Sequence, residues 1–210
     1  KGLVMTIFIN ITVIIICYLI GSIQFGIIYT KIHSGIDIRE FGSKSSGATN
    51  ISRTLGSKAG LFVLILDISK GILPILIIKT MMDFQLVAIL SSCSLVLGHC
   101  FPIFYQFRGG KGIATGTGAV LYQIPLLLVV IPLFLIVSMF TRLISLASII
   151  SCISSILIVT VLVITNNLDP EYLIIGVFIP LLIIFNHRQN IKRLIEKKEN
   201  KFSFKKNVTK

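Results

Sequence analysis

The sequence predicts an all-α, polytopic integral membrane protein, and three observations support this prediction. Hydrophobic residues make up 54% of the 210 positions, charged residues only 13%, and the mean hydropathy is +0.95. An ordinary soluble domain carries about 25% charged residues. Apolar runs long enough to cross a bilayer as helices recur along the whole chain. We therefore expect residues 1–210 to form a single membrane-embedded domain, with a basic tail from about residue 186.

Apolar runs define the expected spans. The runs that we interpret as one crossing each lie at residues 3–20, 59–78, 84–99, 143–164 and 172–185. The run at 112–140 is too long for one crossing and short for two, and Pro125 marks its natural break. The first run is too long for a cleaved signal peptide and lacks a small-residue cleavage pattern, so we expect it to stay as a span.

The positive charges decide the number of crossings. If residues 112–140 cross twice, about seven spans result, and every Lys and Arg except Lys1, Lys70 and Lys79 falls on one side. Lys and Arg gather on the cytoplasmic side of membrane proteins. We therefore expect seven spans, with the N-terminus outside and the C-terminus in the cytoplasm. Six spans would put the polar clusters described below on different faces.

The net charge of +12 is concentrated in loops and a tail beside the apolar runs. This arrangement indicates attraction to anionic membrane lipid and anionic substrates, and it argues against nucleic acid as a partner. The cysteines are scattered without the spacing of metal ligands, so neither a zinc site nor a disulfide framework is favoured. No metal or organic cofactor is expected, and nothing in the sequence implies an oligomer.

Two features of the apolar runs concern helix packing. Small residues within 21–26 (GSIQFG) end the first span and would let another backbone approach closely. Asp67 and Lys70 are three residues apart and share one helical face. A charge at membrane depth is costly unless it is paired or faces a cavity. We expect the pair to neutralise itself in the protein interior, with a role in a site as the alternative.

Two polar clusters have the composition of anion-binding loops. The first follows the first span and combines Arg39 and Arg53 with Gly, Ser, Thr and Asn, which supply donors without bulk. The second, 98–115, has adjacent glycines whose backbone N–H groups can turn toward a phosphate, beside Arg108 and Lys111. The alternatives are a flexible loop for the first cluster and, for the second, a turn whose cations bind lipid headgroups and set topology.

Together with a third cluster in the tail, these segments resemble the three signature motifs of the bacterial acyl-phosphate glycerol-3-phosphate acyltransferases, which are small integral membrane enzymes. The matching segments are 21–26 with 37–39, 42–43, 47–50 and Arg53 for the first motif, 98–102 with 109–115 for the second, and 187–194 with Glu199 for the third. No single match is specific. The set is specific because it follows the family's order and spacing over nearly the whole chain.

The resemblance implies transfer of a fatty acyl group from acyl phosphate to the 1-hydroxyl of sn-glycerol 3-phosphate. The products would be 1-acylglycerol 3-phosphate (lysophosphatidic acid) and phosphate, in the first step of phospholipid biosynthesis. The partners would be these two substrates and membrane lipid, in a bacterial cytoplasmic membrane with the active site facing the cytoplasm. A fatty acyl phosphate has a good leaving group, so no covalent enzyme intermediate is required. The enzyme then has to orient the two substrates and stabilise the charge that develops on the acyl carbonyl and the departing phosphate.

The same resemblance implies the site residues. Catalytic roles fall on His187, Asn190, Ser43 and Lys111. Substrate binding falls on Arg39, Gly47, Thr49, Asn50, Arg53, His99, Arg108, Gly109, Gly110, Gly112 and Glu199. His187 and Asn190 share one helix face and would orient the glycerol hydroxyl or the oxyanion. Either His187 acts as a general base or the substrate phosphate takes the proton, and His99 is expected to position other groups by hydrogen bonding.

The chain departs from the family pattern at three places. Lys44-Ser45 stands where Gly-Asn is usual, Gln24 where proline is usual, and Lys197 where a glycine precedes Glu199. The first departure replaces an amide by a hydroxyl and adds a cation inside an expected phosphate loop. None of the three changes the expected fold.

The alternative function is a membrane transporter for a phosphate-bearing metabolite, which would also require converging cations. A carrier binds near the bilayer midplane, whereas these cations gather at one face. A non-catalytic scaffold is disfavoured by the density of site-like residues. A soluble P-loop enzyme is excluded, because Gly110-Lys111 lacks the upstream glycine spacing, the following Ser or Thr, and a preceding strand.

Overall fold

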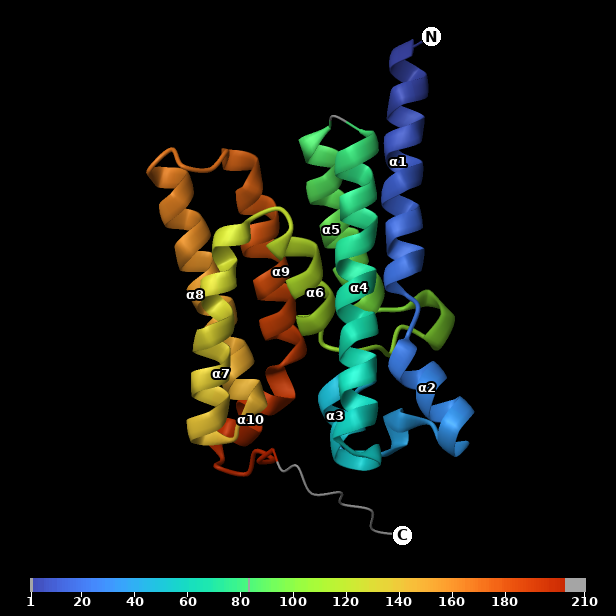
Figure 1. The fold of residues 1–210 in the computed structure, drawn as a ribbon, viewed down its shortest axis with the longest axis vertical. Coiled ribbons are helices and arrows are strands. Elements are labelled where there is room, and N and C mark those ends of the chain that lie inside the picture. The colour runs from blue at the N-terminus through green and yellow to red at the C-terminus, as the bar shows by residue number, and fades with distance from the viewer. Residues whose placement is uncertain (1, 83, 203–210) are drawn as a thin grey trace.

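The computed structural model describes residues 2–82 and 84–202, and in these residues every regular element is a helix. Figure 1 shows two groups of helices along one long axis with α6 (Ile113–Leu121) between them. The first group is α1 (Gly2–Gly21), α4 (Ser57–Met81) and α5 (Gln85–Cys100). The second is α7 (Val130–Thr141), α8 (Ile144–Ile164) and α9 (Leu173–Asn186).

Short helices gather at the end of the bundle opposite the start of α1 (Figure 1). They are α2 (Phe25–Ser34), α3 (Ala48–Leu55) and α10 (Arg188–Ile195). The 3-10 turns are η1 (Ile38–Glu40), η2 (Ile103–Tyr105), η3 (Pro125–Val129) and η4 (Pro170–Tyr172). The first and third polar clusters of the sequence therefore lie at one end of the molecule.

The predicted spans are present as helices whose ends differ from the prediction by a few residues. The break predicted near Pro125 is confirmed, since α6 ends at Leu121 and η3 begins at Pro125. By length and hydropathy, four helical segments of the described chain can cross a membrane, or five if α9 and α10 form one bent span. α6 has 9 residues and rises only about 14 Å. Helix length alone therefore does not give the predicted count of seven.

The polar segment after the first span contains two helices that the sequence analysis did not predict. α2 starts after a break at residues 22–24 and buries Ile27 and Thr30. α3 buries Asn50 and Ile51 on one face and leaves polar groups on the other. Both helices are short, and their stability comes from packing on the bundle rather than from propensity.

Glycines let the long helices touch backbone to backbone. A Cβ added at Gly21 would overlap the backbone of Leu95, and one added at Gly98 would overlap that of Tyr18. These contacts join α1 to α5, and they confirm the close approach predicted for the end of the first span. Gly118 packs in the same way on the backbone of Ile68, which joins α6 to α4. Small residues at such crossings are typical of membrane helices.

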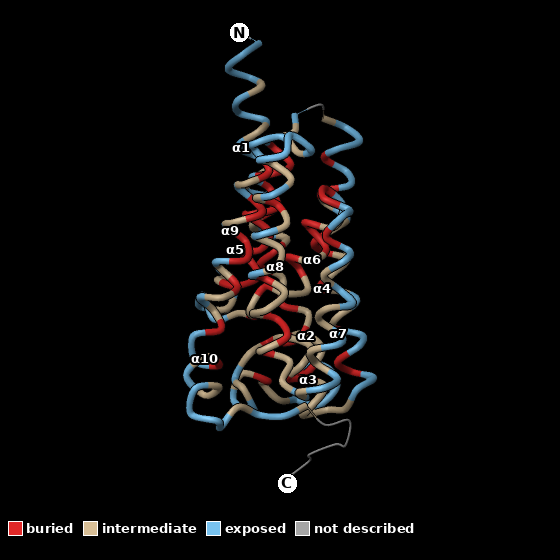
Figure 2. Tube along the Cα trace, turned by 90° about the vertical axis from the view of Figure 1, so that its left-hand side faces the viewer, coloured by how far each residue is buried: buried red, intermediate tan, exposed pale blue. Residues whose placement is uncertain are grey.

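The core of the bundle is apolar, and the ion pair between Asp67 and Lys70 is buried in it. Figure 2 shows buried residues inside the bundle and exposed residues along the outer faces and the free end of α1. The predicted pairing is confirmed, because Nζ of Lys70 lies 2.8 Å from Oδ1 of Asp67 and both side chains are 2% exposed. The ammonium also donates to the carbonyl of Ile23 at 2.6 Å. The pair thus fixes α4 to the break between α1 and α2.

Candidate active site

A cavity of about 1220 Å³ opens among α3, the loop before α6, and the end of α9. It continues into the bundle along α7 and α8. Most of the predicted site residues line it. They are Ser43, Gly47, Thr49, Asn50, Arg53, His99, Lys111, Gly112, His187, Asn190 and Glu199. Residues far apart in the sequence therefore meet at one site.

The first wall is the N-terminal turn of α3 and the loop before it. The loop is organised by the buried side-chain amide of Asn50. Its Nδ2 donates to the carbonyls of Ile38, Phe41 and Ser45 at 3.2, 3.0 and 2.9 Å, and its Oδ1 accepts from the N–H of Ser43 at 2.9 Å. The first N–H groups of a helix have no intrahelical partner and favour anions. This wall therefore presents hydrogen-bond donors that suit an anion.

The second wall is the glycine-rich loop that precedes α6. Gly112 adopts φ +91°, a left-handed conformation that glycine accepts at little cost. The ammonium of Lys111 donates to Oδ1 of Asn190 at 2.5 Å. Burial lowers the pKa of Lys111 to about 8, with Arg193 and Arg53 adding to the fall and Glu199 opposing it. Lys111 is therefore a cation at neutral pH that loses its charge under mildly alkaline conditions.

His187 lies between α9 and α10 and is 2% exposed. Its Nδ1 is 2.8 Å from the carbonyl of Ile183. Because a carbonyl only accepts, Nδ1 carries the proton and Nε2 keeps a free lone pair. Burial, followed by the charge of Lys111, lowers the pKa of His187 to about 4. The imidazole is thus neutral at pH 7 and offers an acceptor.

Glu199 holds the tail against the bundle. Its carboxylate accepts from Oγ of Ser145 at 2.9 Å, from Nδ2 of Asn190 at 2.7 Å, and from Nε of Arg193 at 2.7 Å. Burial acts to raise the pKa of Glu199, but these hydrogen bonds outweigh it and leave the pKa below its ordinary value. The guanidinium of Arg53 donates to the carbonyl of Asn200 at 2.9 Å. The tail therefore joins α8 and α10 to α3.

Four predicted site residues do not line the cavity. They are Arg39, Arg108, Gly109 and Gly110. Arg108 is exposed, whereas Gly110 is buried against the ring of His99 and donates its N–H to the carbonyl of His99 at 3.1 Å. The structure thus gives Gly110 a contact within the protein.

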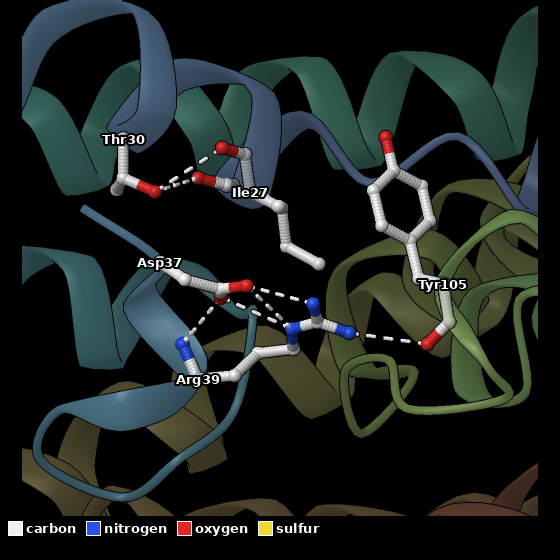
Figure 3. Close-up of polar contacts among 6 residues, drawn as sticks. Ile27, Thr30, Asp37, Arg39 and Tyr105 are labelled. Carbon is white, nitrogen blue, oxygen red and sulfur yellow. Dashed lines mark hydrogen bonds and ion pairs between the residues drawn. The ribbon is translucent and has the colours of Figure 1, made fainter. Parts of the chain in front are cut away.

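The guanidinium of Arg39 is engaged elsewhere. It pairs with Asp37 at 2.7 Å and donates to the carbonyl of Tyr105 at 3.1 Å, as Figure 3 shows. The hydrogen bond from Arg39 is the main reason that the pKa of Asp37 falls to about 2. Arg39 therefore links the loop before α3 to the turn after α5.

Beside the predicted residues, the cavity is lined by polar groups that the sequence analysis missed. Along α8 they are Ser145, Ser148, Ser151 and Ser155. These serines are three or four residues apart, so they share one helix face within an apolar span. That spacing was the signal available in the sequence.

The buried pair of α4 reaches the same cavity. Asp67 lines it together with His99, and Nδ1 of His99 lies 3.7 Å from Oδ1 of Asp67. Among the described residues, Nδ1 of His99 has no hydrogen-bond partner, whereas Oδ1 of Asp67 is held by the ammonium of Lys70 at 2.8 Å. The hydrogen bonds that the structure gives His99 are made by its backbone carbonyl, which accepts from Gly110 and Gln24, so the positioning role expected of its ring stays a prediction.

The inner part of the cavity is apolar. Its lining there includes Leu127, Val130, Ile131, Phe134, Leu135, Ile175 and Ile179. One continuous cavity thus joins cations and helix N–H groups to a hydrocarbon-like interior. The fold and the site together define an all-helical membrane protein that is suited to a molecule with an anionic head and an apolar chain.

The comparisons with known proteins identify the family. The sequence model of the glycerol-3-phosphate acyltransferase family matches residues 11–197. A glycerol-3-phosphate acyltransferase of Bacillus subtilis is 42% identical over 189 residues, covering 90% of this chain and 95% of its own. One of Fusobacterium nucleatum is 37% identical over 195 residues, covering 91% and 97%. The chain belongs to the glycerol-3-phosphate acyltransferase family.

Solved structures agree. The crystal structure of PlsY, an integral membrane glycerol 3-phosphate acyltransferase, matches in its glycerol 3-phosphate form with a TM-score of 0.84 and 37% identity, covering 92% of this chain and 96% of that one. Its lysophosphatidic acid form matches with a TM-score of 0.82 and 36% identity, covering 93% and 96%. The family inferred from the motifs is confirmed, and the chain is an acyltransferase.

We expect Glu199→Gln to lower the free energy of unfolding at pH 7 by roughly 1–3 kcal/mol, because Arg193 loses a charged hydrogen-bond partner. Since the folded-state pKa of Glu199 lies below its ordinary value of 4.5, its stabilising effect is complete above pH 4.5 and is lost as the pH falls through the folded-state pKa. Denaturation of the detergent-solubilised protein measures both effects.

The control is Glu196→Gln, because Glu196 is exposed and lies 3.6 Å from Lys198. Such surface pairs contribute little, so this variant should unfold like the wild type. Equal stability of wild type and Glu199→Gln at pH 7 would contradict the role given to Glu199 in holding the tail.

Proposed function

We propose that this chain transfers a fatty acyl group from acyl phosphate to the 1-hydroxyl of sn-glycerol 3-phosphate, releasing 1-acylglycerol 3-phosphate and phosphate. The observation that carries the proposal is the cavity that joins a cationic end to an apolar interior. Both substrates carry phosphate, and the donor also carries a long apolar chain. The two parts of the cavity match these two requirements.

We assign phosphate binding to Ser43, to the N-terminal turn of α3, and to Arg53 and Lys111. Helix N–H groups and Arg supply directed donors, whereas Lys acts as a point charge. Because Lys111 is partly withdrawn from water, its attraction for an anion is stronger than that of a surface lysine. Asn190 and Glu199 orient Lys111, while Arg39, Gly110 and His99 hold the loops without touching substrate.

In the reaction, the glycerol hydroxyl oxygen attacks the acyl carbonyl carbon. An ester C–O bond forms, and the C–O bond to phosphate breaks with its electron pair leaving on phosphate. Nε2 of His187 accepts a hydrogen bond from the hydroxyl and orients it. The phosphate that leaves the acyl phosphate dianion carries three negative charges, so it is a far stronger base than His187, whose pKa is about 4. The hydroxyl proton therefore ends on the departing phosphate.

We propose one domain with about seven crossings in a bacterial cytoplasmic membrane. α6 and the segment from η3 through α7 would be the two short crossings. The start of α1 and α10 lie at opposite ends of the bundle, which supports an odd number (Figure 1). Because the Lys and Arg side faces the cytoplasm, the N-terminus would be outside, and the cavity mouth and the C-terminus in the cytoplasm.

The function is tested with the purified protein in lipid vesicles, supplied with labelled glycerol 3-phosphate and either acyl phosphate or acyl-CoA. We expect labelled lysophosphatidic acid from acyl phosphate alone. Product from acyl-CoA alone would contradict the assignment of acyl phosphate as the donor. The absence of product from either donor would contradict the proposed acyl transfer. Uptake of label into the vesicles without product would instead indicate the transporter.

Two histidine variants make this assay specific. His187→Ala should lower the rate by roughly 10²-fold or more, because the hydroxyl loses its orienting acceptor. His33→Ala is the matched control, since His33 is exposed and stacks on Tyr29 away from the cavity. Equal rates for the two variants would contradict the role of His187.

Lys111 makes the activity depend on pH. We expect kcat/KM for glycerol 3-phosphate to fall as the pH rises above about 8, because the cation is present below its pKa and lost above it. Arg stays charged over this range, so Lys111→Arg should keep its own activity to higher pH. Rate measurements from pH 6 to 10 compare the two proteins. Profiles that fall at the same pH would show that another group titrates.

The topology is tested with single cysteines at opposite ends of the bundle. We expect Asn167→Cys to react with a membrane-impermeant maleimide in intact cells, and Lys198→Cys to react only after permeabilisation. Both positions are exposed, and the native cysteines are buried. Labelling of Lys198→Cys in intact cells would reverse the proposed orientation.

A further inference from the structure

Gln24 lies between the two loops that form the walls of the cavity. It stands at the break between α1 and α2, and it is 1% exposed. The residue before it is fixed, because the carbonyl of Ile23 accepts from the ammonium of Lys70 at 2.6 Å. A long polar side chain is thus held in the protein interior with its amide between the loop before α3 and the loop before α6.

Both ends of this amide are used, each by a different loop. Its Oε1 accepts from Oγ of Ser46 at 2.6 Å, and Ser46 is also 1% exposed. Its Nε2 donates to the carbonyl of His99 at 3.1 Å. The same carbonyl accepts from the N–H of Gly110 at 3.1 Å. The side-chain amide of Gln24 therefore connects Ser46, in the loop before α3, to the carbonyl of His99, which also holds Gly110 of the glycine-rich loop.

Each loop is otherwise held by contacts of its own. Asn50 closes the loop before α3, and the contact between Gly110 and His99 closes the other. A second link between the two regions is the hydrogen bond from the guanidinium of Arg39 to the carbonyl of Tyr105 (Figure 3). The side chain of Arg39 is 23% exposed. A buried hydrogen bond is not weakened by competing water. Gln24 is therefore placed to set where one wall lies relative to the other.

We propose that Gln24 is a positioning residue whose amide holds the two phosphate-binding loops in register, so that acyl carbonyl and glycerol hydroxyl meet at the reacting distance. The inference rests on the proposed acyl transfer. Because each loop is closed by its own contacts, each substrate still binds when Gln24 is replaced. Replacement of Gln24 therefore lowers kcat, because acyl transfer requires both substrates to be aligned.

Gln24→Met tests this with nearly unchanged side-chain volume. We expect KM for glycerol 3-phosphate to stay within about twofold and kcat per folded molecule to fall roughly 10- to 100-fold, because a misplacement of about 1 Å costs on the order of 10²-fold. The matched control is Gln123→Met. Gln123 is also buried and donates to a buried serine, Ser92, at 2.6 Å, but it is not among the residues that line the cavity.

The control separates positioning from stability. Both variants should melt at lower temperature than the wild type, because each loses a buried hydrogen bond. Only Gln24→Met should lose kcat when assayed well below its melting temperature. Equal kcat for the two variants would overturn the proposal, and so would a loss in Gln24→Met that appears in KM alone.

Ser46→Ala cuts the link on one side. We expect a smaller fall in kcat than for Gln24→Met, and the double variant Gln24→Met/Ser46→Ala should match Gln24→Met, because both changes break the same connection. Fully additive losses would mean that the two residues act independently, and they would overturn the proposal.

A readout without turnover separates this inference from the proposed function. Amide hydrogen exchange in residues 107–112 and 42–47 should be faster in Gln24→Met than in Gln123→Met. If the wild type transfers no acyl group, the proposed function fails, and the exchange rates still decide whether Gln24 links the loops. Unchanged exchange in both loops would overturn the link itself.

Discussion

The contact on which the site depends is the hydrogen bond between Lys111 and Asn190. Its acceptor is a neutral amide, and the Nδ2 of that amide donates to the carboxylate of Glu199. A direct salt bridge would satisfy the ammonium and compete with any phosphate. The amide holds Lys111 in place and leaves its charge available. The sharp bend of 60° between α9 and α10 is what brings Asn190 to the loop before α6.

A membrane bundle must satisfy its polar groups internally, and this requirement shapes where the cavity can form. At depth, Asp67 is paired with Lys70, and Gln123 with Ser92. The groups that remain available to a ligand gather at one end, where short helices replace long ones. Because α3 and α10 are short, each presents a helix terminus or a polar face to the cavity and does not extend the apolar bundle.

The sequence predicted the helical class, the spans and the break at Pro125, because these follow from local hydropathy and from the chemistry of proline. Most of the site residues that the sequence named, through motifs that carry their own chemistry, line the cavity. The sequence did not predict that Arg39 would bond to the carbonyl of Tyr105, which is 66 residues away. Such partners are fixed by tertiary packing, which leaves no local pattern. The serines of α8 were missed because the hydropathy of their span dominated the interpretation.

The departure at Lys44-Ser45 shows why the loop before α3 keeps its shape when its side chains change. Lys44 is exposed and is not among the residues that line the cavity. Its φ of +56° is a left-handed backbone conformation, which costs energy in a residue other than glycine. Ser45 contributes its carbonyl to Asn50 and its hydroxyl to the N–H of Gly47. Asn50 binds the backbone of the loop, which every residue type provides. The geometry of this wall therefore depends on Asn50, and substitutions at 44 and 45 alter its surface without dismantling it.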